Sequence, residues 1–458
     1  MKRLLFASAA LCALGWPAFG VAASGGDVSL GRKETSGSGP DVSLAGDVSR
    51  KKPKAEEARP ALSYDSFRFQ LELQVAGQRR AQMDTLKKII ALGTNDREMP
   101  DLIFQYAELA WEESRYLFFE ANRKDDDFIK AKNVGDQAGM QKATAEKNDL
   151  MTQSGTWQVE AISRYKEIVR RYPKYQRMDE VLYFLGHNLW DQNQEKEALG
   201  VYKLLVVRYP QSKYVADAYL AFGEYYFDNS KGQRPPLLKA LAAYKKAASF
   251  PENKVYLYAL YKQGWCHYNL GEFSQALDMF KTVILYADLS SSVTNGNKLK
   301  LAKDARKDYV LTYSRDSRLF NPLGAKDNFL KVGGQENYWS MLKGLAGLYF
   351  DDGKDKESIL TYFQLIKDRP LSPEAPFFQA RIVDATMRIG RKNITAKQAQ
   401  ILVQILQQVQ QGGMAKTEEE KKELAQAADL AERTLSNLAV TWHNEGKKTR
   451  DEETFALD

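Results

Sequence analysis

The sequence has 458 residues, of which 27% are charged, and its formal net charge is +7. This positive excess is small for the length, and no basic residues cluster in the stripe that nucleic-acid binding requires, so we expect no nucleic-acid partner. The length fits two or three ordinary domains, although a single array of repeats can also fill it.

The first 23 residues have the pattern of a cleaved signal peptide. Lys2 and Arg3 precede an apolar run from Leu4 to Leu14, and small residues precede the cleavage site before Ser24. The apolar run is too short to span a membrane, which takes roughly 20 residues, and no later stretch is long enough. We therefore expect a mature chain without a transmembrane segment, exported to a bacterial periplasm.

Residues 24–60 are predicted to form a disordered linker. They are rich in Gly, Ser, Lys and Asp and repeat the tripeptide Asp-Val-Ser, so they cannot bury enough apolar surface to offset their ordering entropy. A run of lysines closes the segment, and a tether is favoured there over a site that binds the cell wall. Cys12 lies in the signal peptide, which leaves Cys266 without a disulfide partner and predicts that it is a buried apolar residue.

Helical periodicity begins after the linker. A helix that packs on the following array is predicted over residues 61–94, because apolar residues recur there at three- and four-residue spacings and Gly93 follows them. A long polar helical insertion is predicted over residues 112–156. A capping helix is predicted over residues 416–446, where it would cover the last apolar face of the array.

Between these segments, small, aromatic and proline residues recur at fixed distances. In the clearest copy Gly186 is followed by Ala198, Tyr202 and Pro210, at intervals of 12, four and eight residues. The small residues would allow two antiparallel helices to cross closely, and proline would end the second helix. The aromatic ring is expected to fill the gap towards the next hairpin. Further copies of the pattern, complete or partial, are Ala161-Tyr165-Pro173, Gly223-Ala240-Tyr244, Gly264-Ala276-Phe280 and Ala346-Ser358-Tyr362-Pro370.

This pattern resembles the tetratricopeptide-repeat (TPR) family, whose units have about 34 residues. The resemblance covers residues 97–411 and is carried best by 185–210, 263–280 and 345–370. It implies an all-α fold, a superhelical solenoid of antiparallel helix hairpins. More narrowly, the chain is similar to exported TPR proteins of the Gram-negative cell envelope, among them the periplasmic proteins of the myxobacterial gliding machinery.

The sequence contains no arrangement of residues that predicts catalysis. Its histidines, at positions 187, 267 and 443, lack metal-ligand spacing, and no phosphate-binding loop or nucleophile elbow is present. Glu357 precedes Ser358 as in helical lytic transglycosylases, but Ser358 takes the small-residue position of a repeat. We therefore predict no catalytic residue, no metal, no cofactor and no enzyme activity.

Aromatic residues recur at matching positions of the first helices, and the TPR resemblance implies that these helices line a concave groove. They stand four residues after the small residue of each unit, or two helical turns earlier on the same face. His187 is expected on an exposed part of this face. The predicted partner-binding residues are Phe104, Trp111, Tyr183, His187, Trp190, Phe227, Tyr261, Trp265, Tyr268 and Phe350.

Two interpretations of this aromatic set have equal weight. The rings are partly exposed and bind a partner, or they pack between neighbouring first helices and hold the array together. Acidic residues follow several of the rings, for example Asp191 and Asp228, so the expected ligand is an extended segment with apolar and basic side chains. No clamp of Lys and Asn residues for a terminal carboxylate is present among these positions.

The function predicted from these features is a non-enzymatic, periplasmic protein–protein interaction scaffold. The chain would be monomeric alone and would join other envelope proteins in a hetero-complex, of which gliding-motility or adhesion machinery fits best. An adaptor for cell division or outer-membrane assembly is the alternative. A peptidoglycan-active enzyme is the third hypothesis, and the missing catalytic constellation argues against it.

Overall fold

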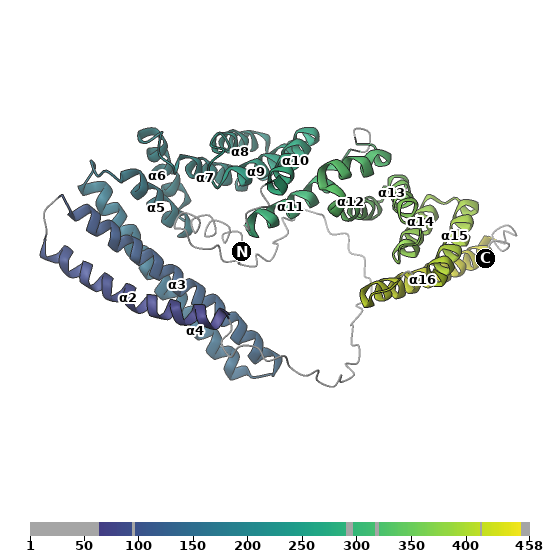
Figure 1. Cartoon of the computed structure of the whole chain (residues 1–458), viewed down its shortest axis with the longest axis horizontal. Helices are drawn as coiled ribbons and strands as arrows, with labels where there is room; N and C mark the ends of the chain where they lie inside the picture. The colour runs from purple at the N-terminus through teal and green to yellow at the C-terminus, as the bar shows by residue number, and fades with distance from the viewer. Residues whose placement is uncertain (1–63, 94–96, 290–295, 317–319, 413–414, 450–458) are drawn as a thin grey trace. The chain divides into compact units, whose positions relative to one another are not determined.

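The computed structural model (Figure 1) describes residues 64–93, 97–289, 296–316, 320–412 and 415–449. All regular elements in these ranges are helices, and neighbouring helices pair as antiparallel hairpins, which confirms the predicted all-α fold. The predicted signal peptide (1–23) and linker (24–60) lie outside the described residues. The helices divide into two compact units at Ala221 and Phe222.

The first unit contains a long hairpin and one short hairpin. Its helices are α2 (Tyr64–Leu92), α3 (Met99–Asn133), α4 (Gln137–Arg171), α5 (Met178–Asp191), α6 (Glu195–Arg208) and the first half of α7 (Val215–Asp228). Helices α3 and α4 have 35 residues each, so the residues of the predicted insertion (112–156) prolong both helices of one hairpin. Gly135, with φ of +73°, makes the turn, and the Asp136 side chain caps α4 by accepting a hydrogen bond from Gly139 N at 3.0 Å.

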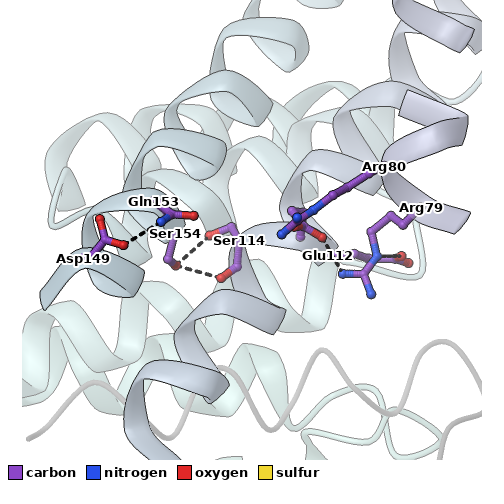
Figure 2. A network of polar contacts seen from close by, with 8 residues as sticks. Arg79, Arg80, Glu112, Ser114, Asp149, Gln153 and Ser154 are labelled. Atoms are coloured by element: carbon purple, nitrogen blue, oxygen red, sulfur yellow. Dashed lines mark hydrogen bonds and ion pairs between the residues drawn. The ribbon is translucent and has the colours of Figure 1, made fainter. Parts of the chain in front are cut away.

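Polar side chains join the long hairpin internally and fasten α2 to it. Figure 2 shows Arg79 and Arg80 of α2 directed towards α3, and Ser114 of α3 beside Ser154 of α4. The carboxylate of Glu113 is fully buried and accepts from Arg79 Nη1 at 3.1 Å and from Arg80 Nε at 2.7 Å. The hydroxyl groups of Ser114 and Ser154 lie 3.1 Å apart. These small side chains let the two long helices approach closely.

The second unit continues the series of hairpins. After the second half of α7 its elements are α8 (Arg234–Ala247), α9 (Tyr256–Asn269), α10 (Phe273–Leu289), α11 (Gly296–Tyr313), η2 (Pro322–Gly324), α12 (Ala325–Asp351), α13 (Asp355–Asp368), α14 (Ala375–Ile389), α15 (Lys392–Gln411) and α16 (Glu418–Thr449). Gly334 interrupts α12 with φ of +64°, a value that favours glycine. The first part of α12 therefore pairs with α11, and the second part begins the hairpin with α13.

The small residues of the repeat pattern lie directly under an aromatic ring. A Cβ atom added at Gly186 or Gly264 would come within 2.6 Å of a ring carbon of Tyr202 or Phe280. The ring therefore covers the glycine of its own hairpin, which the sequence-based interpretation did not foresee. Tyr165 also reaches the next hairpin, as expected, and stacks on Phe184 with ring centroids 6.2 Å apart.

Helix α16 packs on α14 and α15. Its buried residues follow one stripe, and the stripe comprises Ala427, Ala431, Thr434, Leu438, Trp442 and Gly446. This stripe joins an apolar cluster with Ala380, Val383 and Leu402. Among the described residues, no helix is sufficiently long and apolar to cross a membrane.

Candidate functional site

The residues predicted to bind a partner occupy first helices in both units. In the first unit they are Phe104 and Trp111 on α3 and Tyr183, His187 and Trp190 on α5. In the second unit they are Phe227 on α7, Tyr261, Trp265 and Tyr268 on α9, and Phe350 on α12. The structure separates them into a buried group and a half-buried group.

Five of the predicted residues are buried, which corrects the expectation of partly exposed side chains at these positions. Their relative exposures are 0% for Phe104, 2% for Trp111, 3% for Tyr183, 4% for His187 and 9% for Phe350. In the first unit these side chains contact each other or the next first helix. The centroid of the Trp111 ring lies 5.8 Å from that of His187 and 5.5 Å from that of Phe184. Tyr183 stacks on Tyr214 with ring centroids 4.2 Å apart. Here the alternative interpretation applies, in which the rings hold neighbouring hairpins together.

The expected exposure of His187 is wrong for a specific reason. Helix α5 is short and lies between the long hairpin α3–α4 and α6, so most of its circumference is covered and nine consecutive residues, Val181–Leu189, are buried. The His187 ring is enclosed by Trp111 and Tyr183, and its Nδ1 lies 3.2 Å from Asp191 Oδ2. This histidine is part of the packing between hairpins.

The other five predicted residues are half-buried: Trp190, Phe227, Tyr261, Trp265 and Tyr268. Three of them share one face of α9. Trp265 packs edge-on against Tyr268 with ring centroids 5.3 Å apart. Each of these side chains therefore has a packed side and a side open to solvent. This combination is typical of the aromatic anchors of binding surfaces.

Polar contacts fasten the α9 face to Asp308 on α11 and to Arg315 in the turn that follows α11. The Tyr261 hydroxyl group donates to Asp308 Oδ2 at 2.6 Å, and Trp265 Nε1 donates to the same oxygen at 3.2 Å. Arg315 Nε donates to the Tyr268 hydroxyl group at 2.7 Å. Burial raises the pKa of Asp308 to about 6, although both hydrogen bonds act in the opposite direction.

The Asp308 contacts place α11 beside α9 as the next first helix of the array. Asp308 and Arg315 are seven residues apart, as are Tyr261 and Tyr268, and each lies 47 residues after its counterpart. Asp308 and Arg315 are not among the predicted residues, because the repeat pattern consists of small and aromatic residues. The signal that indicates them is the seven-residue spacing, which continues from α11 into the turn after Tyr313.

The same spacing continues to the end of the array. Lys343 and Phe350 on α12, and Arg381 and Arg388 on α14, are again seven residues apart. The guanidinium carbons of Arg388 and Arg381 lie 4.0 Å and 4.6 Å from the centroid of the Phe350 ring. We call the set Tyr261, Tyr268, Asp308, Arg315, Lys343, Phe350, Arg381 and Arg388 the first-helix face of the second unit.

Within the described ranges, no group of three or more His, Cys, Asp or Glu residues could hold a metal ion. Burial raises the pKa of the Cys266 thiol to about 12, which suppresses its nucleophilic form. Ser358, which follows Glu357 in the motif noted above, is fully buried between its two helices, with Oγ 3.4 Å from Ala346 O.

Comparison with protein families gives one match, over residues 258–287, to the tetratricopeptide repeat. The chain carries a tetratricopeptide repeat. This TPR comprises most of α9 and most of α10, and its first helix presents Tyr261, Trp265 and Tyr268. TPR arrays are solenoids whose extended surfaces bind other proteins.

Among solved structures, the chain is similar to a tetratricopeptide repeat protein from Parabacteroides merdae, with 15% identity, 69% of this chain and 99% of that chain covered, and a TM-score of 0.30. It is also similar to the TPR domain of P58(IPK), with 13% identity, 80% of this chain and 98% of that chain covered, and a TM-score of 0.21. A third similar structure is a computationally designed, self-assembling cyclic homo-oligomer. It has 15% identity, with 74% of this chain and 95% of that chain covered, and a TM-score of 0.13. No curated protein sequence matches the chain.

Proposed function

We propose that this protein is a non-enzymatic scaffold that binds other proteins through the first helices of its TPR array. The observation that carries the proposal is the face of α9, where Tyr261, Trp265 and Tyr268 are packed on one side and open to solvent on the other. Tyr, Trp and Arg dominate binding hot spots, and Arg315 lies against the same face. Such a surface can hold an extended segment of a partner.

We further propose a place for this scaffold in the bacterial periplasm. The support is the signal-peptide pattern of residues 1–23. The similarity to envelope TPR proteins favours a complex for gliding motility or adhesion, and an adaptor for cell division or outer-membrane assembly is the second candidate. Fusion of the first 23 residues to a reporter enzyme that is active only outside the cytoplasm tests the location. An inactive fusion protein that accumulates in the cytoplasmic fraction would contradict it.

Site-specific photocrosslinking in intact cells tests the binding face. A photoreactive phenylalanine analogue would replace Tyr268 on α9 or Trp190 on α5, which are both first helices. In matched controls it would replace Tyr286 or Phe363, which lie on second helices with relative exposures of 43% and 40%. We expect discrete adducts with envelope proteins from the first two positions. Adducts from only the control positions would move the binding surface to the second helices and overturn the proposal.

Affinity measurements with the captured partner supply the energetic test. Truncation of an anchor residue costs about 2 kcal/mol of binding free energy, and about 1.4 kcal/mol is a tenfold change in Kd. Tyr268→Ala should therefore weaken binding by roughly thirtyfold. The same variant should melt close to the parent temperature, because the ring is only half-buried. Unchanged affinity would exclude Tyr268 as an anchor.

A further inference from the structure

We propose that the exposed face of α8 docks on an anionic membrane surface. This inference concerns a second helix and a lipid partner, so it goes beyond the protein-binding function proposed for the first helices. Its basis is the distribution of charge and apolar surface on α8, which differs from the mixed charges of the neighbouring helices.

The segment around α8 is basic and lacks carboxylates. No acidic residue occurs between Asp228 and Glu252. The helix itself carries exposed cations at Arg234, Lys239, Lys245 and Lys246. By contrast, the next second helix, α10, exposes both Asp278 and Lys281. The α8 face therefore presents one sign of charge along its whole length.

These cations are available to an external partner. Arg234 lies 3.5 Å from Glu272, and its side chain is still 63% exposed. Lys239 Nζ lies 5.7 Å from the centroid of the Tyr226 ring. In the ranges that the structure describes, no carboxylate forms an ion pair with Lys239, Lys245 or Lys246. The nearest acidic groups along the chain, Asp228 and Glu252, lie outside the helix.

The arrangement around the helix axis favours a membrane over a protein. Successive residues turn by about 100°, so the exposed positions of α8 fall within an arc of about 140°. Leu238 and Ala242 lie at the centre of this arc, and Leu238 is 44% exposed. Arg234 and Lys245 flank them on one edge, and Lys239 and Lys246 flank them on the other. An apolar centre between two basic edges is the pattern of helices that lie in the membrane interface.

The types of basic residue on α8 also favour a membrane partner. Three of the four cations are lysines, whose compact, strongly hydrated charge suits a diffuse anionic surface. Bidentate recognition of a particular carboxylate would favour arginine instead. The opposite side of α8 is filled by Leu237, Leu241 and Tyr244, which are buried in the array. The helix is thereby held rigidly with its basic face outward.

The test is cosedimentation of the full chain with vesicles of phosphatidylcholine alone or mixed with phosphatidylglycerol at a ratio of three to one. We expect binding that depends on phosphatidylglycerol and that weakens as salt rises, because salt screens charge. Each basic residue near an anionic surface changes the partition coefficient by about fivefold. The variant with Arg234, Lys239, Lys245 and Lys246 all changed to Gln should therefore lose binding by several hundredfold.

Two further variants distinguish this site from general electrostatics. Changing Lys196, Lys203, Lys281 and Lys367 to Gln removes the same total charge from exposed positions elsewhere, and this variant should keep its binding. Leu238→Ser leaves the charge unchanged and should still weaken binding. Equal losses in the two fourfold variants would overturn the proposal. So would binding of the parent chain to polyglutamate together with no binding to the anionic vesicles, which would assign the face to an acidic protein.

Discussion

Tyr261 and Asp308 are 47 residues apart, yet the Tyr261 hydroxyl group donates a hydrogen bond of 2.6 Å to Asp308 Oδ2. Trp265 Nε1 donates to the same oxygen, so one carboxylate on α11 holds two aromatic side chains of α9. This contact spans two consecutive first helices of the array. It fixes the orientation of the rings that we propose as binding anchors, and it couples their packing to the protonation of Asp308.

The first prediction is that Asp308 makes stability depend on pH. Its pKa in the folded protein is about 6, above the ordinary value of 3.8, so the folded state binds the proton more tightly than the unfolded state. The stabilisation is complete below about pH 4 and is lost as pH rises through 6. The difference between the folded and the ordinary pKa of Asp308 corresponds to roughly 3 kcal/mol in the free energy of unfolding. Asp304 raises the pKa of Asp308 and Lys307 lowers it, with smaller effects than burial.

Urea denaturation at pH 5 and pH 8 measures this effect. The parent chain should gain stability at pH 5 relative to Asp308→Asn, which cannot titrate. Tyr261→Phe removes a hydrogen bond that lowers the pKa of Asp308, so it should shift the transition to higher pH. The same pH dependence in the parent and in Asp308→Asn would show that this carboxylate does not contribute.

The second prediction compares two glycines in first helices of the second unit. Gly264→Ala would place a methyl group 2.6 Å from Cε1 of the buried Phe280 ring, and we expect a loss of about 1–3 kcal/mol from overpacking. Gly347→Ala meets no atom within 4 Å and should stabilise α12 by up to about 1 kcal/mol, because alanine favours helix. Thermal melts of both variants decide the matter. A stabilising Gly264→Ala would mean that the ring does not lie over the glycine as described.

The repeat pattern shows which features of the fold can be read from the sequence. Gly264 and Phe280 are recognisable because close crossing of two helices restricts both positions, and the restriction recurs in every well-formed unit. The all-α fold followed from this pattern. The exposure of individual rings does not follow from the pattern, because it depends on which side chains of the neighbouring hairpin lie against each ring. His187 is enclosed by Trp111 from another helix, and no spacing within α5 reveals this contact.

The same limit explains why the sequence does not predict Asp308 and Arg315 as members of the candidate face. Asp308 and Arg315 belong to a unit whose first helix lacks the small residue of the pattern, and their polar side chains do not indicate a first-helix face. Only their contacts with Tyr261 and Tyr268 assign them to the same face as these two aromatic residues. The half-buried state of Tyr268 agrees with a binding role, whereas the burial of Phe350 beneath Arg388 agrees with a packing role.

The third prediction concerns the thiol of Cys266. Burial raises its pKa to about 12, and the side chain is fully buried. In a Cys12→Ser variant, a thiol reagent such as Ellman's reagent should therefore leave Cys266 unmodified at pH 8 and should react with it stoichiometrically once guanidinium unfolds the chain. Rapid reaction in the folded state would place the thiol at the surface.

The last prediction concerns the attachment of α2 through Arg79 and Glu113, beside the residues in Figure 2. Glu113 is fully buried and Arg79 is 4% exposed, so Arg79→Met leaves a buried carboxylate with only the more exposed Arg80 as its partner. Loss of one partner of a buried ion pair costs about 3 kcal/mol or more. Replacing both Arg79 and Glu113 with Met should restore most of the stability, since no charge then remains buried.

An exposed pair on the same hairpin supplies the control. Lys147 Nζ lies 2.6 Å from Asp125 Oδ1, with side-chain exposures of 31% and 54%, so Lys147→Met should cost less than about 1 kcal/mol. Hydrogen exchange of the α2 amides separates local release of α2 from global unfolding, because each reports a different opening reaction. We expect faster exchange in α2 for Arg79→Met and no change for Lys147→Met. Equal effects of the two variants would show that apolar contacts such as Met83, rather than the buried charges, attach α2 to the long hairpin.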